Sequence, residues 1–163
     1  MQNFQNFQKS FVEKGKLLSE KIISFLRNND FQDISEDGDV LINGNNYSGN
    51  ISAGCDVSIG RNNTSDDISA GCDVSIGRNN DSNNILACCD ISIKGNNSSN
   101  DISAGDNVYI GRNNDSGNVL ARYDISIKGD NYSYDIISKD GNIFIDGTNQ
   151  ICNKLIAKFW MPS

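Results

Sequence analysis

Residues 39–140 contain six consecutive copies of one 17-residue unit, and this repeat decides the fold. The copies read DVLINGNNYSGNISAGC (39–55), DVSIGRNNTSDDISAGC (56–72), DVSIGRNNDSNNILACC (73–89), DISIKGNNSSNDISAGD (90–106), NVYIGRNNDSGNVLARY (107–123) and DISIKGDNYSYDIISKD (124–140). A fixed period of this length is typical of a solenoid, in which each unit forms one coil that packs on its neighbours. We number the positions of the unit from 1 to 17 and call the residues at one position of successive units a row.

Apolar and polar residues alternate at two places in the unit. Positions 2 and 4 hold only Val or Ile, position 13 holds Ile or Val, and position 15 holds Ala in every unit except the last. Alternation with a period of two, in residues that are β-branched or small, predicts strands with one buried face. No helical spacing of apolar residues occurs inside the unit, so we expect an all-β fold.

Two polar positions do not vary, because position 8 is always Asn and position 10 is always Ser. The row at position 8 consists of Asn46, Asn63, Asn80, Asn97, Asn114 and Asn131. Stacking in register places equivalent residues about 4.8 Å apart. At this spacing the amides can hydrogen-bond along the stack and satisfy one another inside a narrow core. We therefore predict a structural Asn ladder.

Three inward-facing pairs follow from these rows: V-x-I at positions 2–4, N-x-S at positions 8–10 and I-x-A at positions 13–15. They predict a single-stranded, three-sided β-helix of about seven coils, with glycines of positions 5 and 16 at the bends. A flattened two-sided solenoid is the alternative, because the alternation can be traced from position 13 into position 4 of the next unit.

Residues 1–26 have a different pattern. Apolar residues, among them Phe4, Phe7 and Phe11, recur at steps of three and four with charges between them, which predicts an amphipathic helix over about 6–26. Such a helix would cap the open end of the solenoid, where strand edges are otherwise exposed. Because its net charge is positive, binding to a membrane surface is an alternative role, and binding to a partner protein is another.

The spacing slips by one residue after Asp140, so that residues 142–149 resemble a seventh, incomplete coil. Residues 150–163 are apolar without the pattern of the unit. We expect them to form either a C-terminal cap or an exposed docking surface for a second subunit. The residues of this surface would be Leu155, Ile156, Phe159 and Trp160.

The repeat begins directly at the end of the predicted helix, with no linker between them. We therefore expect residues 1–163 to form a single domain. Its parts are an N-terminal helix (1–26), the β-helix repeats (27–149) and a C-terminal cap or docking segment (150–163).

Charge and composition limit the function. The net charge of −7 is uneven, since residues 1–27 carry +3, residues 151–163 carry +2 and the middle carries −12. An acidic solenoid is a poor partner for nucleic acid. No signal peptide and no apolar run long enough to span a bilayer are visible, and five cysteines without a disulfide pattern are typical of a reducing cytosol. We therefore expect a cytoplasmic protein.

Position 17 brings three cysteines into one row, Cys55, Cys72 and Cys89. A thiolate metal site would use such a row. We favour a simpler interpretation, in which small, half-buried cysteines occupy a corner of the coil. Other residue types, Asp106 and Tyr123, stand at the same position, so that the corner does not require sulfur.

Two charged rows are further candidates. The acidic row at position 1 consists of Asp39, Asp56, Asp73, Asp90 and Asp124, interrupted by Asn107. Its carboxylates could bond to turn backbone, bind calcium, or meet a basic row of another molecule. The basic row consists of Arg61, Arg78, Lys94, Arg112 and Lys128. This row is either a solvated corner or a site for lateral pairing or anion binding.

No grouping of these residues has the geometry of a catalytic site, and the chain has no histidine, the commonest general base. We therefore expect no enzymatic activity, no cofactor and no bound metal.

The coil length and the V-x-I and I-x-A pairs over about residues 28–149 resemble those of bactofilins. The resemblance implies a three-sided β-helix and a cytoskeletal protein that polymerises end to end. The apolar segments at both ends of this chain differ from the short tails of that family and put end-to-end contact in doubt.

These observations lead to one functional hypothesis and one alternative. The first is a structural or scaffolding solenoid that associates with itself into a homo-oligomer or filament. The alternative is a binding module that uses one repetitive face to recognise a polymer, a surface or a protein partner. For that face the best candidate is the outward row at position 3, which is mostly Ser.

Overall fold

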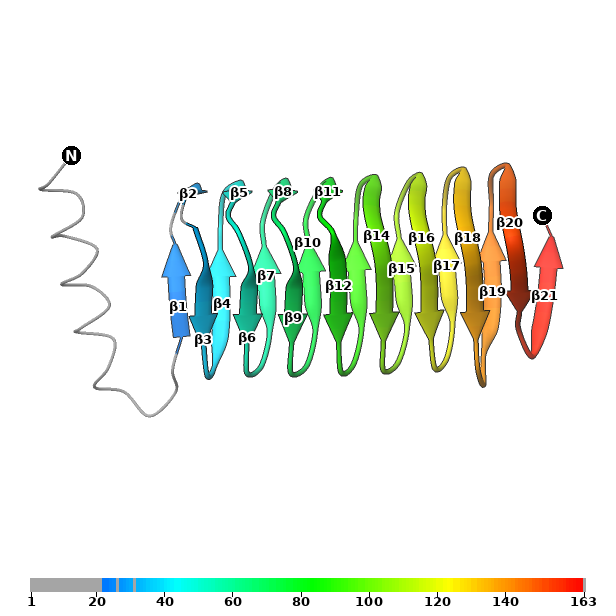
Figure 1. The fold of residues 1–163 in the computed structure, drawn as a ribbon, viewed down its shortest axis with the longest axis horizontal. Helices are drawn as coiled ribbons and strands as arrows, with labels where there is room; N and C mark the ends of the chain where they lie inside the picture. Colours follow the sequence, from blue (N-terminus) through cyan, green and yellow to red (C-terminus); the bar gives the residue numbers. More distant parts are fainter. Residues whose placement is uncertain (1–21, 26, 31, 163) are drawn as a thin grey trace, which may run out of the picture.

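The computed structural model describes the backbone of residues 22–25, 27–30 and 32–162, and the side chains of the same residues as far as 158. It is a parallel β-solenoid of about eight turns. The coils lie side by side in a straight row from β1 to β21 (Figure 1). We number the coils 1 to 8, each beginning at a strand of the first sheet described below.

The first sheet, sheet A, has nine parallel strands and contains the V-x-I segments. Its strands are β1 (Ile22–Phe25), β4 (Asp39–Ile42), β7 (Val57–Ile59), β10 (Val74–Ile76), β13 (Ile91–Ile93), β15 (Val108–Ile110), β17 (Ile125–Ile127), β19 (Asn142–Ile145) and β21 (Phe159–Pro162). From β4 to β17, successive strands pair with a spacing of 17 residues, as in Val57↔Val74.

The second sheet, sheet B, has twelve strands and contains the N-x-S and I-x-A segments. In coils 1–4 these segments are separate strands: β2 (Asn29–Asp30), β5 (Asn46–Tyr47), β8 (Asn63–Thr64) and β11 (Asn80–Asp81), and then β3 (Ile34–Glu36), β6 (Ile51–Ala53), β9 (Ile68–Ala70) and β12 (Asn84–Ala87). In coils 5–8 they merge into β14 (Asn97–Ala104), β16 (Asn114–Ala121), β18 (Asn131–Ser138) and β20 (Asn149–Ile156). All three predicted segments are therefore present, although they form two sheets.

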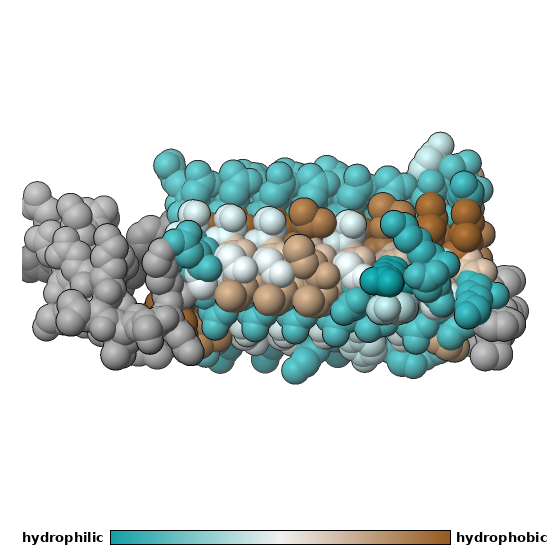
Figure 2. Space-filling model, turned by 90° about the horizontal axis from the view of Figure 1, so that it is seen from below, coloured by the Kyte–Doolittle hydropathy of each residue, from teal (hydrophilic) through white to brown (hydrophobic). Residues whose placement is uncertain are grey.

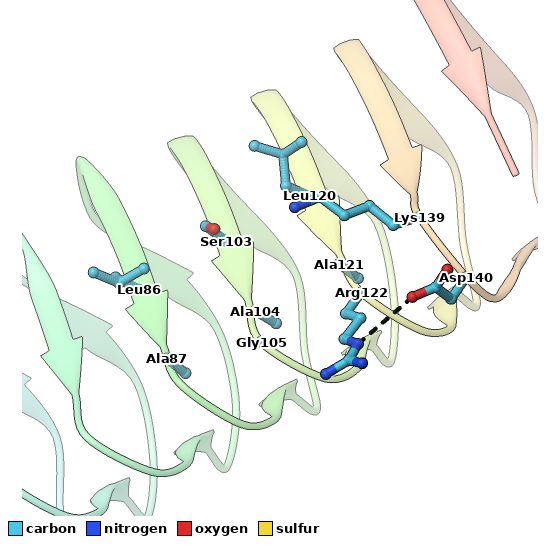
Figure 3. A pocket seen from close by; sticks show the side chains of 10 residues that line it. All are labelled: Leu86, Ala87, Ser103, Ala104, Gly105, Leu120, Ala121, Arg122, Lys139 and Asp140. Atoms are coloured by element: carbon cyan, nitrogen blue, oxygen red, sulfur yellow. Dashed lines mark ion pairs between the residues drawn. The ribbon is translucent and has the colours of Figure 1, made fainter.

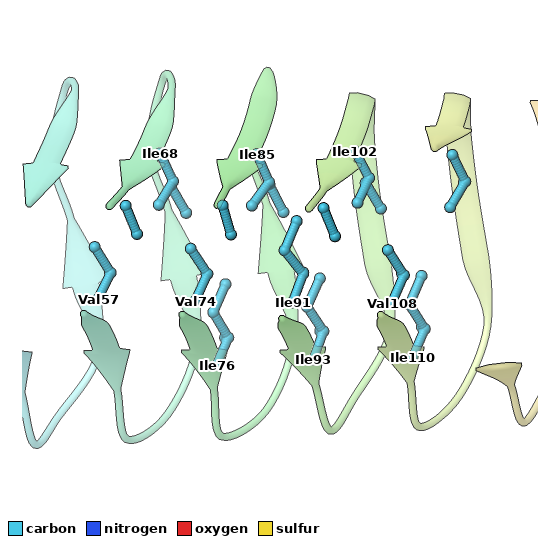
Figure 4. Close-up of a cluster of buried hydrophobic side chains, with 14 of the residues drawn as sticks. Val57, Ile68, Val74, Ile76, Ile85, Ile91, Ile93, Ile102, Val108 and Ile110 are labelled. Atoms are coloured by element: carbon cyan, nitrogen blue, oxygen red, sulfur yellow. The ribbon is translucent and has the colours of Figure 1, made fainter. Parts of the chain in front are cut away.

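The core lies between the two sheets. The side chains of Val57, Val74, Ile91 and Val108 in sheet A face those of Ile68, Ile85 and Ile102 in sheet B (Figure 4). The predicted inward rows are confirmed as buried, since Val or Ile at positions 2, 4 and 13 is at most 4 % exposed in coils 2–7. Because β-branched side chains pack well on a pleated surface, the same few residues can fill every coil.

The N-terminal end of the solenoid differs from the prediction. Residues 22–25, expected at the end of a helix, form β1 and pair with β4 through Ile23↔Val40 and Phe25↔Ile42. Pairing with the sheet therefore decides the conformation of this stretch, whose apolar spacing also matched a helix. The remainder of the predicted helix, including Phe4, Phe7 and Phe11, lies outside the described residues.

The C-terminal segment also continues the solenoid. The predicted slip is confirmed, because Ile125 pairs with Ile143, one residue further than the repeat. A second irregularity lies between Ser133 and Asp135, where the register to β20 shifts again. Beyond these two insertions, the segment expected to lack the pattern forms β20 and β21, so that it is an eighth coil and the start of the next rather than a separate cap.

The glycines of positions 5 and 16 lie at the bends, as predicted. No described glycine has a positive φ. A Cβ added at Gly71 would collide with the carbonyl oxygen of Gly54, and one at Gly105 with that of Cys88. Glycine at these bends therefore permits close approach of consecutive coils rather than a left-handed backbone.

Candidate functional site

The predicted Asn ladder runs through the core. The Nδ2 of each Asn donates to the Oδ1 of the Asn in the next coil at 2.7–2.9 Å, from Asn29 as far as Asn149. In most coils the same Nδ2 also donates to the Ser Oγ two residues later, as Asn80 does to Ser82 at 2.9 Å. Because every bond has the same direction, the first acceptor, Asn29 Oδ1, is buried and has no hydrogen-bond partner among the described residues. The ladder satisfies its own amides and has a structural role.

The carboxylates of the acidic row at position 1 accept hydrogen bonds from backbone amides, which is one of the three interpretations given for this row. Asp56 Oδ1 accepts a hydrogen bond from Asp73 N at 3.0 Å, and Asp73 Oδ1 accepts one from Asp90 N at 3.0 Å. Each carboxylate thus satisfies the amide of the following coil at the bend. Within the described residues, no group of three or more His, Cys, Asp or Glu side chains could hold a metal ion.

Two further side-chain rows with this role were not identified from the sequence. At position 7, Asn79 Oδ1 accepts a hydrogen bond from Asn96 N at 2.9 Å. At position 12, Asp67 Oδ1 accepts one from Asn84 N at 3.1 Å and a second from Asn84 Nδ2 at 2.9 Å. The signal was present, because all six units carry Asn or Asp at both positions.

The cysteine row lies at a corner and is poorly suited to nucleophilic chemistry. Partial burial raises the pKa of the Cys72 thiol, and the neighbouring Cys55 and Asp56 raise it further. Burial likewise raises the pKa of Cys89, followed by the charge of Asp73. Because the thiolate is the nucleophile and the metal ligand, a raised pKa lowers reactivity at neutral pH.

The basic row is exposed along its whole length. Lys128 Nζ lies 3.1 Å from a carboxylate oxygen of Asp146, and a second ion pair outside this row joins Arg122 to Asp140 at 3.5 Å. Both pairs lie at the solvent surface, where such contacts add little stability.

The outer face of sheet B carries the most distinctive surface of the molecule. Its central row is position 14, which in coils 1 to 8 consists of Ser35, Ser52, Ser69, Leu86, Ser103, Leu120, Ile137 and Ile156. Leu86 is 51 % exposed and Ile156 is 40 % exposed. Figure 2 looks onto the bends where the strands of sheet B end, and a band along the upper part of this view is white over the N-terminal coils, interrupted once by brown, and brown towards the C-terminal coils. Apolar surface is therefore concentrated over one half of the face.

A shallow hollow of about 410 Å³ lies on this face. Leu86 and Leu120 project from alternate coils, and the shorter Ser103 lies between them (Figure 3). The ion pair between Arg122 and Asp140 borders the hollow at one side. Because the side chain of Ser103 is short, a notch lies between the exposed Leu86 and the half-buried Leu120.

The docking residues predicted at the C-terminus separate in the structure. Ile156 is exposed in the position-14 row beside Ile137. Leu155 is partly buried against the core instead. Phe159 and Trp160 belong to β21, which pairs with β19, and their side chains lie outside the description.

Comparison with protein-family models, with curated proteins and with solved structures found no match to this chain. Among the described residues, no helix is long and apolar enough to cross a membrane.

Proposed function

We propose that this chain is a non-enzymatic, cytoplasmic scaffolding solenoid that associates with itself into a homo-oligomer or filament. The observation that carries the proposal is the apolar surface on the outer face of sheet B. Leu120, Ile137 and Ile156 are consecutive neighbours in register, and all three side chains face away from the core. Ile156 is exposed and Leu120 and Ile137 are half-buried, and contiguous apolar surface of this kind is typical of an interaction site.

The shape of the molecule supports this proposal. The coils stack in a straight row (Figure 1). Because equivalent residues of successive coils pair in register, we expect the side chains of one row to point in the same direction along its length. A flat, regular face of this kind can meet a second regular face along many coils at once. The repeat pattern resembles that of bactofilins, whose β-helices assemble, and this resemblance adds support for self-association.

The test is the mass of the purified protein as a function of concentration. Analytical ultracentrifugation at low and high salt, with negative-stain electron microscopy of the same samples, should reveal a homo-oligomer or ordered filaments. Because the interface is expected to be apolar at its centre, association should persist at high salt. A monomer at all concentrations would contradict the proposal and turn attention to the alternative, a binding module.

A further inference from the structure

The position-14 row on the outer face of sheet B has a particular order of sizes. Serine occupies coils 1, 2, 3 and 5, and a large apolar residue occupies coils 4, 6, 7 and 8. When the row is compared coil by coil with the same row in reverse order, every serine meets a large residue and every large residue meets a serine. Such a row is complementary to itself in the antiparallel direction.

We propose that a second copy of this chain packs against this face of sheet B as an antiparallel, twofold-symmetric dimer. The proposal rests on the proposed self-association and names its surface and geometry. The twofold axis runs along the strand direction between coils 4 and 5. Rotation about it reverses the order of the coils and keeps each row opposite itself, so that coil 1 faces coil 8 and coil 4 faces coil 5. A twofold contact of this kind uses one patch on both copies.

In this arrangement every large side chain of the row meets a serine. Leu86 faces Ser103 of the second copy, and the other pairs are Leu120 with Ser69, Ile137 with Ser52, and Ile156 with Ser35. The hollow above Ser103 lies between Leu86 and Leu120 (Figure 3), where it receives Leu86 of the second copy. Two copies of this contact lie beside the axis, at the centre of the interface, where well-packed apolar anchors contribute most to affinity.

The polar row at position 12 agrees with the same axis. In coils 1 to 8 this row consists of Asp33, Asn50, Asp67, Asn84, Asp101, Asn118, Asp135 and Lys154. The antiparallel arrangement places Lys154 opposite Asp33 and every other Asp opposite an Asn. No two carboxylates face each other.

The hydrogen bonds within each copy leave free the amide hydrogens and carboxylate oxygens that Asn–Asp pairs between the two copies need. Asn84 Nδ2 donates to Asp67 Oδ1, and Asn118 Nδ2 donates to Asp101 Oδ1 at 2.8 Å. Each amide retains a second hydrogen, and each carboxylate retains its other oxygen. An Asn of one copy can therefore donate to an Asp of the other without breaking the ladders inside either molecule.

The row at position 16 shows the same relation. In coils 1 to 8 it consists of Asp37, Gly54, Gly71, Cys88, Gly105, Arg122, Lys139 and Lys158. The antiparallel arrangement places Lys158 opposite Asp37, and Arg122 and Lys139 opposite glycines. Tyr134 of β18, which is 55 % exposed at position 11, faces Gly49 of the second copy. Bulk and positive charge on the last three coils thus meet small or acidic residues on the first three.

The rows also fix the register. A shift of one coil in either direction would place Asp67 opposite Asp101 or opposite Asp135 and would bring large residues of position 14 against each other. Like charges placed across an interface disfavour the wrong arrangement. Eight coils at about 4.8 Å each and about six strand residues at about 3.3 Å each give a face of roughly 750 Å² per copy, which is close to the roughly 800 Å² per partner of a stable interface.

Exchanging the charges of Lys154 and Asp33 tests the register between the two copies. Lys154→Asp places two carboxylates opposite each other at both ends of the dimer and should raise the dimer dissociation constant at least tenfold. Asp33→Lys should do the same by opposing two cations. The double variant Lys154→Asp/Asp33→Lys should return to within about threefold of the wild type, because the pair is restored with its charges exchanged. Sedimentation of each variant measures these constants.

Cross-linking provides a second test that does not depend on folding energies. Ser52→Cys/Ile137→Cys places thiols five coils apart within one chain but opposite each other in the dimer. Mild oxidation should yield a covalent dimer in which mass spectrometry finds residue 52 joined to residue 137. The matched control Ser52→Cys/Ser103→Cys should not join its two introduced thiols between chains.

The outcomes separate this inference from the proposed function. A dimer that forms neither the 52–137 link nor the charge-exchanged pair would overturn the antiparallel face and leave self-association intact. A wild-type protein that is monomeric at all concentrations would overturn both.

Discussion

The first three coils and the last three coils have nearly the same interior and opposite exteriors. Both interiors hold Ile or Val at the buried positions of sheet A apart from Phe25, and both continue the Asn ladder. At positions 14 and 16 on the outer face of sheet B, however, the first three coils show serine, glycine and aspartate where the last three show leucine, isoleucine, lysine and arginine. Stacking therefore constrains the inward rows, while the outward rows are free to encode an interaction.

The largest effect is expected from truncation of the core, and it should be equal in the two halves. Ile59 in coil 3 and Ile127 in coil 7 occupy equivalent buried positions, 1 % and 0 % exposed. Ile59→Ala and Ile127→Ala should each lower the free energy of unfolding by about 2–5 kcal/mol through lost burial and a residual cavity. Urea unfolding followed by circular dichroism measures both. A cost confined to one half would contradict the equivalence of the interiors.

The polar interior should be nearly as sensitive. Asn80 Oδ1 accepts from Asn63 at 2.8 Å, and its Nδ2 donates to Asn97 at 2.9 Å. Asn80→Ala leaves buried amide groups unsatisfied on both sides and should cost about 2–4 kcal/mol. The adjacent, exposed Asp81→Ala is the matched control and should change stability by less than about 0.5 kcal/mol. Similar losses for both variants would show that the ladder is not stabilising.

Substitutions on the outer faces should differ from substitutions in the core, because they should change self-association rather than the free energy of unfolding. Ser69→Trp on sheet B obstructs the site of a facing Leu120 and should weaken self-association at least tenfold, while Ser75→Trp on sheet A should not. Both serines are half-buried at strand centres. Sedimentation of the two variants provides the comparison. An equal loss in both would point to a contact other than the outer face of sheet B.

Much of the interior was predictable from the sequence, because each inward row repeats one residue type and a period of two leaves few alternatives. The ends were less predictable for local reasons. Ile23 and Phe25 replace the V-x-I pair of the first coil and also match helical spacing, so that only pairing with β4 distinguishes the two. In the last coil, insertions at two places shift the register and hide the unit.

The candidate surface extends into these same ends. Ser35 and Ile156 belong to the position-14 row only after the first and eighth coils are identified. The six units alone already contain the antiparallel relation, in the pairs Ser52 with Ile137, Ser69 with Leu120 and Leu86 with Ser103, and the two end coils extend it by Ser35 and Ile156. The outer Asn and Asp ladders were missed for another reason, since these residues are also ordinary turn formers.

A smaller effect concerns the corner thiols. Burial raises the pKa of Cys72 above its ordinary value of 9.0. A raised pKa means that the folded state favours the protonated thiol. The folding stability that this preference contributes is fully present at pH values below the unfolded pKa, and it is lost as the pH rises through the higher folded pKa. Iodoacetamide should therefore label Cys72 more slowly than the exposed Cys152 at pH 8, and the difference should narrow above pH 9 (peptide mass spectrometry measures both rates). Faster labelling of Cys72 at pH 8 would contradict this account.

The smallest effect is expected from the surface ion pairs, which, between described residues, lie in the C-terminal half alone. Lys128 pairs with Asp146 at 3.1 Å, and both side chains are about half exposed. Lys128→Ala should lower the free energy of unfolding by less than about 1 kcal/mol, and the loss should fall further in 0.5 M NaCl because salt screens exposed charges. Arg112→Ala, one coil earlier on the same corner, is the control. A salt-insensitive loss above 2 kcal/mol would mean that charge, and not packing alone, distinguishes the stability of the two halves.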